Sequence, residues 1–267
     1  MYVLFLDILG SASQIEALGR ESEKVLRSEL FTYQQGGVFA SSESLPEGLW
    51  SLTSMYSSFH EIIFEAAQQH VDDWDSRCAI FEFSDSMFFA TDEIGQIIEF
   101  SQTCMHRLYQ RQIPARGGIA CGSFAALTVT MQQSPRGDRF VHCPFLGSAV
   151  VRAYRCERSG KGLRVFIHPS CMVDIRSSQY WRKWLSTEIL PLDKDERSEF
   201  ATHEINLLPS WSSKEILEKL TTMSSKASDA VSHHYKATQR AMTGMKAACV
   251  KRARRERRQS EKFSKNR

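Results

Sequence analysis

The chain has 267 residues, of which 42% are hydrophobic and 24% are charged, an ordinary balance for a soluble globular protein. No stretch reaches the ~18 to 20 apolar residues of a membrane span, and Asp7 interrupts the N-terminal apolar run too early for a signal peptide, so we expect a cytoplasmic protein without membrane contact. Seven scattered cysteines without C-x-x-C spacing indicate a reducing compartment and argue against a zinc site.

The net charge of +3 hides an asymmetry between the body of the chain and its end. Residues 214–267 carry 15 Lys and Arg against 5 Asp and Glu, which leaves 19 basic and 26 acidic residues before Lys214. The body is therefore acidic and the end is basic. We expect a catalytic domain at 1–211 and a basic helical tail at 212–267.

In the first half of the sequence, short apolar runs alternate with segments whose apolar residues recur at helical spacing. Two helices are expected between the first strand and a tight strand pair. In chain order the predicted elements are a strand within Tyr2–Gly10, helices at Ser13–Tyr33 and Leu49–His70, and strands at Cys78–Phe83 and Met87–Thr91.

The second half continues with one helix, two strands, a polar turn, a helix and a short strand. In chain order these are Ile94–Arg111, Ala115–Gly122, Phe124–Met131, the turn Gln132–Asp138, Gly147–Glu157 and Leu163–Ile167. The order β-α-α-β-β-α-β-β-α-β is typical of an α+β fold, a ferredoxin-like antiparallel sheet with helices on one face.

Asp7 and Asp85 are lone carboxylates inside runs that otherwise have the composition of buried strands. A charge in an apolar layer is costly unless a cation or several donors compensate it, so the pair suggests a metal. Gly10 opens a turn whose N–H groups could face an anion, which together with a hard cation describes a nucleoside triphosphate site. The alternative is that each Asp is a strand-end residue that accepts backbone hydrogen bonds.

Four motifs in order over roughly residues 1–175 resemble the class III nucleotidyl cyclases, most closely the bacterial Pycsar pyrimidine cyclases. They are Phe5-Leu-Asp7-Ile-Leu-Gly10, Phe83-Ser-Asp85-Ser, Arg116-Gly-Gly-Ile-Ala-Cys-Gly122 and Gly147-Ser-Ala-Val-Val-Arg-Ala-Tyr-Arg155-Cys-Glu157. Each motif is weak, and their shared order carries the resemblance. It implies the class III cyclase homology domain.

The resemblance implies that Asp7, Asp85 and the carbonyl of Ile8 bind two divalent cations, Mn²⁺ or Mg²⁺. The 3′-hydroxyl of the substrate would then attack the α-phosphorus in line, and pyrophosphate would leave. Phosphate oxygens would be bound by the backbone N–H groups of Leu9, Gly10, Ser11 and Ala12.

Arg155 lies where these cyclases keep a catalytic arginine that stabilises charge at the α-phosphate. The resemblance implies a homodimer in which this arginine reaches the active site across the interface. Arg152 is a rival for the role, and a solvated arginine on a helix surface is the alternative for Arg155.

Several positions depart from the purine cyclases. Phe81 and Pro144 replace the lysine and the acid that read a purine, which favours UTP or CTP, with UTP preferred. Val151 stands in place of an asparagine, and Ser11 in place of a common phenylalanine. Phe81 could stack on the base or be a strand core residue.

The segment Gly36–His70 is longer than the corresponding segment of the purine cyclases, and three of its aromatic residues have two alternative roles. They could contribute to base recognition or form the buried stripe of an amphipathic helix. They are Trp50, Tyr56 and Phe59.

The expected function is a pyrimidine nucleotidyl cyclase that makes 3′,5′-cyclic UMP or CMP, a second messenger of antiphage defence that acts on a separate effector protein. The alternative is a catalytically silent protein of the cyclase fold that binds nucleotide, or nucleic acid through its basic tail. The run Lys251–Arg258 could make weak contacts with nucleic-acid phosphates, although a solvated helix face is the default reading.

Overall fold

The structure is a computed structural model that describes residues 1–16, 47–70, 78–83, 85–126, 130–133, 139–142, 145–180, 184–185, 203–205, 213–227 and 231–240. Its elements are β1 (Tyr2–Ile8), α1 (Ser11–Glu16), α3 (Glu47–His70), β2 (Cys78–Glu82), β3 (Ser86–Thr91), α4 (Ile94–Gln110), β4 (Ala115–Cys121), β5 (Ala125–Ala126), β6 (Thr130–Gln133), β7 (Arg139–His142), β8 (Phe145–Leu146), α5 (Ser148–Glu157), β9 (Val165–Ile167), the 3₁₀ helix η2 (Pro169–Cys171), α6 (Met172–Ser177), β10 (His203–Glu204) and α8 (Ser213–Lys226). Residues 231–240 are also helical.

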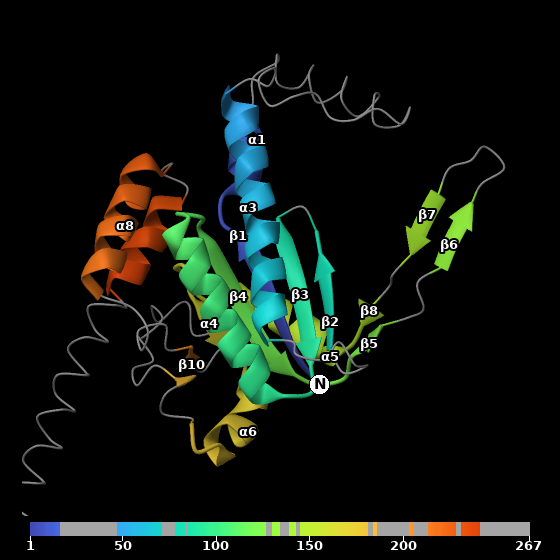
Figure 1. The fold of residues 1–267 in the computed structure, drawn as a ribbon. Helices are drawn as coiled ribbons and strands as arrows, with labels where there is room; N and C mark the ends of the chain where they lie inside the picture. The colour runs from blue at the N-terminus through green and yellow to red at the C-terminus, as the bar shows by residue number, and fades with distance from the viewer. Residues whose placement is uncertain are drawn as a thin grey trace, which may run out of the picture.

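Six strands form the main sheet in the order β10-β9-β4-β1-β3-β2 (Figure 1). β1 pairs antiparallel with β3 and β4, and β2 pairs antiparallel with β3. With α3 between β1 and β2 and α4 between β3 and β4, these four strands have the ferredoxin-like arrangement. β9 is added parallel to β4, and β10 antiparallel to β9. The predicted α+β fold with a mainly antiparallel sheet is confirmed.

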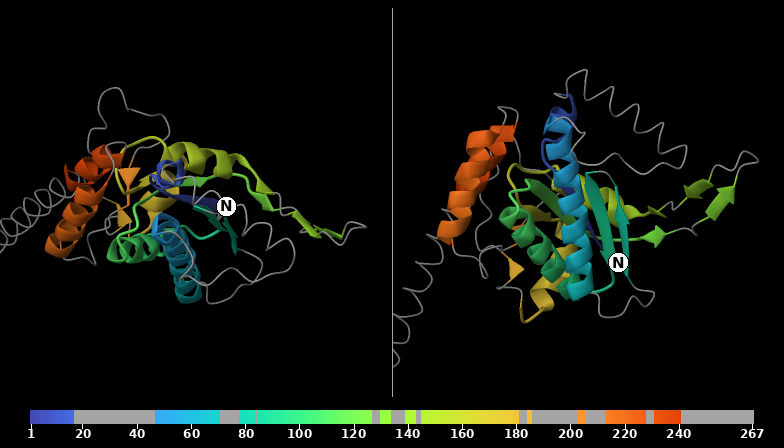
Figure 2. Two further views of the ribbon diagram at one scale, coloured as in Figure 1. Left: turned by 90° about the horizontal axis from the view of Figure 1, so that it is seen from above. Right: turned by 45° about the horizontal axis from the view of Figure 1, so that its top comes forward.

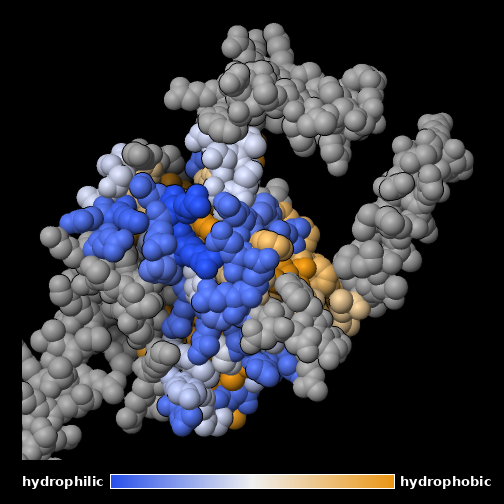
Figure 3. Space-filling view, viewed as in Figure 1, coloured by the Kyte–Doolittle hydropathy of each residue, from blue (hydrophilic) through white to orange (hydrophobic). Residues whose placement is uncertain are grey.

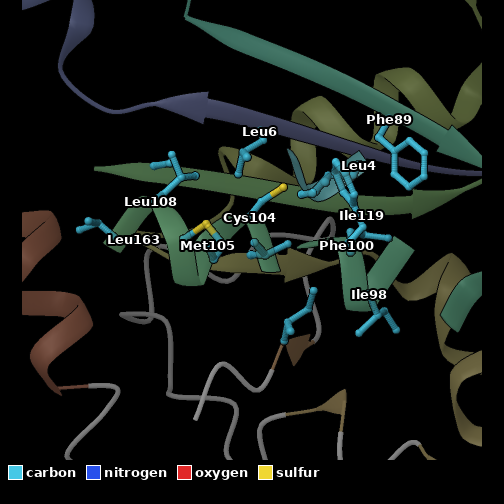
Figure 4. Packing of buried hydrophobic residues seen from close by; sticks show 14 of the residues in the cluster. Leu4, Leu6, Phe89, Ile98, Phe100, Cys104, Met105, Leu108, Ile119 and Leu163 are labelled. Atoms are coloured by element: carbon cyan, nitrogen blue, oxygen red, sulfur yellow. The ribbon is translucent and has the colours of Figure 1, made fainter. Parts of the chain in front are cut away.

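The main hydrophobic core lies between the sheet and helices α3 and α4. Leu4, Leu6 and Ile8 alternate along β1 and point to this face, because successive strand residues face opposite sides. Side chains of α4 pack against them, as Figure 4 shows. The labelled residues include Phe100, Cys104, Met105 and Leu108 of α4.

Helix α5 covers the other face of the sheet, so helices lie on both faces and not on one face only as predicted (Figure 2, left). Ala149 and Ala153 of α5 form a second cluster with Val3 and Phe5 of β1. Gly118 of β4 makes the approach possible, because a Cβ there would lie 2.3 Å from the carbonyl oxygen of Ala153.

The two C-terminal helices pack onto the same core as the sheet. Leu220, Met223 and Tyr235 are buried members of the main cluster. The helix at 231–240 also fastens the loop before β9, since the N–H of Leu163 donates to Thr238 Oγ1 at 2.7 Å. α8 lies within the segment 212–267 that was predicted to be a helical tail.

Three predicted elements differ from the structure or extend past what it describes. The predicted helix Ser13–Tyr33 is described only as α1, and its remainder lies outside the described residues. The predicted strand Phe124–Met131 is instead β5 and β6, which pair with β8 and β7 in two small ladders. The predicted polar turn Gln132–Asp138 begins within β6, because a two-stranded ladder away from the core needs no apolar alternation.

Candidate active site

Asp7 and Asp85 lie on neighbouring segments at the same end of the sheet. Asp7 is the half-buried penultimate residue of β1 and is opposite Ser86 in the β1–β3 register. The N–H of Ile8 donates to the carbonyl oxygen of Asp85 at 2.8 Å, which fixes the turn between β2 and β3 against β1. The structure therefore brings together the two carboxylates that the sequence singles out.

The surroundings of Asp7 disfavour its ionised form. Burial, the carboxylate of Glu157 and the carboxylate of Asp85 raise the pKa of Asp7 from its ordinary value of 3.8 to about 7, against the opposing effect of Arg116 and Arg158. A carboxylate in this position would be stabilised by an additional cation. Two carboxylates and a backbone carbonyl from Ile8 are oxygen ligands of the kind that Mg²⁺ and Mn²⁺ prefer.

Arg116 and Glu157 form a buried ion pair behind Asp7. Arg116 is directly opposite Asp7 in the β1–β4 register. Its guanidinium bonds to the Glu157 carboxylate, and its Nη1 donates to the carbonyl oxygen of Gly160 at 3.0 Å. Glu157 is only 2% exposed, and burial raises its pKa while Arg116 lowers it.

The sequence prediction did not assign a role to this pair, although both residues stand inside the quoted motifs. One signal was available. A glutamate at the buried end of an amphipathic helix needs a cationic partner, and Arg116 is the first charged residue of the neighbouring strand.

The turn after β1 has the left-handed conformation expected at its glycine, since Gly10 has φ +83°. Ser11 is buried at the start of α1, and its Oγ donates to Asp85 Oδ2 at 2.7 Å. The residue that departs from the common family pattern thus holds a predicted metal ligand. The N–H of Leu9 donates to the carbonyl oxygen of Pro114 at 2.8 Å, so the predicted phosphate-binding role falls to Gly10, Ser11 and Ala12.

Tyr56 of α3 faces the two carboxylates. Its hydroxyl is buried and has no hydrogen-bond partner within the described part of the chain. Burial, with Asp85 and Asp7 nearby, raises the pKa of this hydroxyl. Phe59 is fully buried in the main core, which agrees with the alternative of a buried helix stripe, and the side chain of Trp50 lies outside the described residues.

The two candidate arginines of α5 have different surroundings. Arg152 donates from Nη1 to the carbonyl oxygen of Cys121 at 2.9 Å and so is attached to the end of β4. Arg155 is exposed on α5, and its backbone carbonyl accepts a hydrogen bond from Ser159 Oγ at 2.9 Å. An arginine offered to a second chain must be exposed in a single chain, and Arg155 meets this condition.

Phe81 belongs to a half-exposed group of aromatic rings on the α5 face of the sheet. Its ring centroid lies 4.5 Å from that of Phe145, which in turn lies 5.1 Å from Phe88. At the edge of this group Phe83 is 45% exposed and Tyr154 is 43% exposed. Apolar surface is visible near β2 and the β5–β8 pair in Figure 3. The position of Phe81 is compatible both with packing and with stacking on a base.

The sequence matches no family model and no curated protein. Among solved structures, the chain is similar to the guanylate cyclase domain of RhGC from Catenaria anguillulae in complex with GTP, with 11% identity and a TM-score of 0.44 over 77% of this chain and 94% of that chain. It is similar to the adenylyl cyclase CyaB from P. aeruginosa, with 14% identity and a TM-score of 0.41 over 66% and 79% of the two chains. For adenylate cyclases from Trypanosoma brucei in their monomeric state, the identity is 12% and the TM-score 0.45 over 79% and 89%. At such values the function has to be argued from the residues of this chain.

None of the described helices combines the length and the hydropathy that a bilayer span requires. Within the described residues there is also no group of three or more His, Cys, Asp and Glu side chains that could hold a metal ion alone. A cation at Asp7 and Asp85 would therefore complete its coordination with the Ile8 carbonyl, water and substrate oxygens.

Proposed function

We propose that this protein is a metal-dependent nucleotidyl cyclase that converts a nucleoside triphosphate to the 3′,5′-cyclic nucleotide and pyrophosphate. The observation that carries the proposal is the convergence of Asp7 and Asp85 beside the turn at Gly10. The backbone bond of 2.8 Å from Ile8 to Asp85 makes this convergence a property of the sheet rather than of flexible side chains.

The residues present fit a pair of hard divalent cations. Asp7, Asp85 and the Ile8 carbonyl would hold two Mn²⁺ or Mg²⁺ ions per active site, and the raised pKa of Asp7, about 7, indicates unbalanced negative charge there. The buried hydroxyl of Tyr56, which has no partner within the described residues, would gain one from bound water or substrate. When bound, the cations supply a lowered pKa for the ribose 3′-hydroxyl and charge compensation for the triphosphate.

The chain's own residues then perform three tasks. Ser11 holds the Asp85 carboxylate through the 2.7 Å bond from its Oγ. The backbone N–H groups of Gly10, Ser11 and Ala12 donate to phosphate oxygens. Arg116 balances part of the charge at Asp7 and is itself held by Glu157.

The fourth task, stabilising charge at the α-phosphate, belongs to Arg155 of a second copy. Arg155 is exposed beside Tyr154, and Val151 on the same helix is 50% exposed, so α5 offers an apolar and cationic surface to a partner. A homodimer would place two active sites at the interface, since the same surface is presented twice. Exposed aromatic residues are enriched in such interfaces.

The base specificity that we propose is for a pyrimidine, UTP before CTP. Phe81 carries no charge or hydrogen-bonding group to read adenine or guanine, and its ring is half-exposed. The position of Pro144 lies outside the described residues. The cyclic product would be an alarm signal of antiphage defence in the cytoplasm, read by a separate effector protein.

The direct test is incubation of the purified protein with each of the four nucleoside triphosphates and Mn²⁺, followed by mass spectrometry of the products. A cyclic pyrimidine nucleotide is expected, and Asp85→Asn should abolish it. Asp92→Asn is the matched control because Asp92 is an exposed carboxylate at the end of β3. Absence of any cyclic product from folded protein would reject the cyclase and leave the silent, nucleotide-binding or nucleic-acid-binding alternative.

The interface arrangement has its own test. Asp85→Asn and Arg155→Ala should each be inactive alone, because each removes one half of every site. Mixed in equal amounts, the two variants form heterodimers with one intact site, so about a quarter of the wild-type turnover should return. No recovery on mixing would place Arg155 outside the partner's site.

A further inference from the structure

A cavity of about 690 Å³ lies between α3, the loop after α4, the Leu9–Gly10 turn and the C-terminal helices. Its volume is in the range of small-molecule sites in proteins. In Figure 3 an apolar spot enclosed by hydrophilic surface is visible between α8 and α3, on this side of the molecule.

The cavity adjoins the carboxylate site but does not include the carboxylates. Leu9 and Gly10 of the turn after β1 line it, whereas neither Asp7 nor Asp85 is among its lining residues. On α3 the lining residues follow one stripe, and Tyr56, which faces the carboxylates, lies about 100° or more around the helix from it. That stripe is formed by Ser51, Ser54, Met55 and Ser58.

The lining combines polar and apolar groups. Three serine hydroxyls on α3 and the amides of Gln14 and Gln112 supply hydrogen-bonding groups. Met55 on the same stripe of α3, together with Met223 and Tyr235 of the C-terminal helices, supplies apolar surface. The described lining residues include one cation, Arg111, and no carboxylate. Arg111 Nη2 lies 3.8 Å from Glu61 Oε2, and the Arg111 side chain is 57% exposed, so its guanidinium remains accessible to a ligand.

The loop after α4 lines the cavity with Gln112, Ile113 and Pro114. Gln112 has φ +59°, a conformation rare for a residue with a side chain, and such positions gather at ligand sites. Two residues further on, Pro114 accepts the hydrogen bond from the N–H of Leu9, so this loop is joined to the turn at Gly10. A molecule in the cavity would contact both the turn and the C-terminal helices.

We propose that this cavity is a binding site for an amphipathic organic anion, with its apolar body against Met55 and Met223 and its anionic group toward Arg111. The ligand need not be a nucleotide, and the proposal stands whether or not the protein cyclises triphosphates. Because the site borders Leu9 and Gly10, its occupant would contact the turn to which the proposed function assigns phosphate binding.

The test uses 1-anilinonaphthalene-8-sulfonate, an aromatic sulfonate with the required chemistry, and the full-length protein. Saturable binding of one molecule per chain is expected by fluorescence. In spectra of methyl-labelled methionine, the signals of Met55 and Met223 should shift at saturation. Met87 and Met105 are fully buried outside the cavity lining and serve as internal controls whose signals should not shift.

Two variants with matched controls locate the site. Ser54→Trp, at a lining position, extends into the cavity from α3 and should weaken binding at least about tenfold, whereas Ser57→Trp, at a position of the same helix outside the lining, should not. Arg111→Gln should weaken binding about fivefold, and Arg176→Gln on α6 should leave it unchanged. Full affinity in Ser54→Trp, or unshifted Met55 and Met223 signals at saturation, would overturn the proposal.

Discussion

Replacing Asp7 with Asn should stabilise the cation-free protein above neutral pH, although it removes a predicted metal ligand. The pKa of Asp7 is raised from 3.8 to about 7 by burial and by the carboxylates of Glu157 and Asp85. In the unfolded chain this carboxyl ionises near pH 4, whereas the folded protein keeps the proton until about pH 7. Folding therefore loses stability as pH rises through this window, and the loss is complete above the folded-state pKa. Asparagine does not ionise, so the variant escapes the loss.

The magnitude follows from the size of the pKa change. At 1.36 kcal/mol per pKa unit, the difference between 3.8 and about 7 sets an upper limit of about 4 kcal/mol at pH 8. Since the side chain is partly exposed, solvent screening lowers the expected gain to about 2 kcal/mol. The gain should be smaller at pH 5, because the folded wild type is then still protonated.

Urea denaturation in EDTA at pH 5 and pH 8 measures both values. Asp92→Asn, at an exposed position, is the control and should change stability by less than about 0.5 kcal/mol. Addition of Mn²⁺ at 100 times its Kd should stabilise the wild type by about 2.7 kcal/mol and Asp7→Asn by much less. If Asp7→Asn lowers stability at pH 8 in EDTA, or if its gain is equal at both pH values, the electrostatic account of this site is refuted.

Three further predictions concern packing and charge, and denaturation followed by circular dichroism tests each of them. Gly118→Ala should lower the free energy of unfolding by more than about 3 kcal/mol, because its Cβ would lie 2.3 Å from the α5 backbone. Gly95→Ala, whose Cβ would lie 3.4 Å from its nearest atom, should change it by less than about 1 kcal/mol, and similar losses in both variants would contradict the close approach of α5. Arg116→Gln should lower the free energy of unfolding by about 3 kcal/mol, because it leaves the buried Glu157 carboxylate without its partner. Adding Glu157→Gln to this variant should restore at least half of the loss, which a purely steric effect would not do. Removal of residues 241–267 should change the thermal midpoint of unfolding by no more than about 3 °C, because the described core contacts of the C-terminal helices precede residue 241. An unfolded shortened chain would contradict this prediction.

Hydrophobic periodicity was sufficient to predict the central part of the fold. The strand at β1 and the helices α3 and α4 have strong, regular apolar patterns because each buries one or both faces in a single core. The short ladders β5–β8 and β6–β7 were missed for the converse reason. Two-stranded ribbons outside the core do not need a repeating apolar face, so a polar pair such as Gln133 and Arg139 leaves no pattern to detect.

The two aspartates of the site were predictable because a lone charge in an apolar run departs from the surrounding pattern. The position of Tyr56 beside the two carboxylates and the Arg116–Glu157 pair were not predicted, since both depend on how helices pack across the sheet. Glu157 reaches Arg116 only because Gly118 lets α5 approach β4 at backbone distance, and no local pattern in α5 reports that contact. Tyr56 is one of several aromatic residues on α3, and only its packing distinguishes it from Phe59.

The charge balance around Asp7 links this packing to the proposed chemistry. Three carboxylates interact here, those of Asp7, Asp85 and Glu157, and the opposing cations are Arg116 and Arg158. With all of them ionised, the group carries a net charge of about −1, which would repel a triphosphate of charge near −4. Two divalent cations would change this to about +3, close to neutrality with the substrate. The buried Glu157 would therefore do more than hold Arg116. By keeping the site negative in the absence of cations, it would make the proposed triphosphate binding depend on their presence.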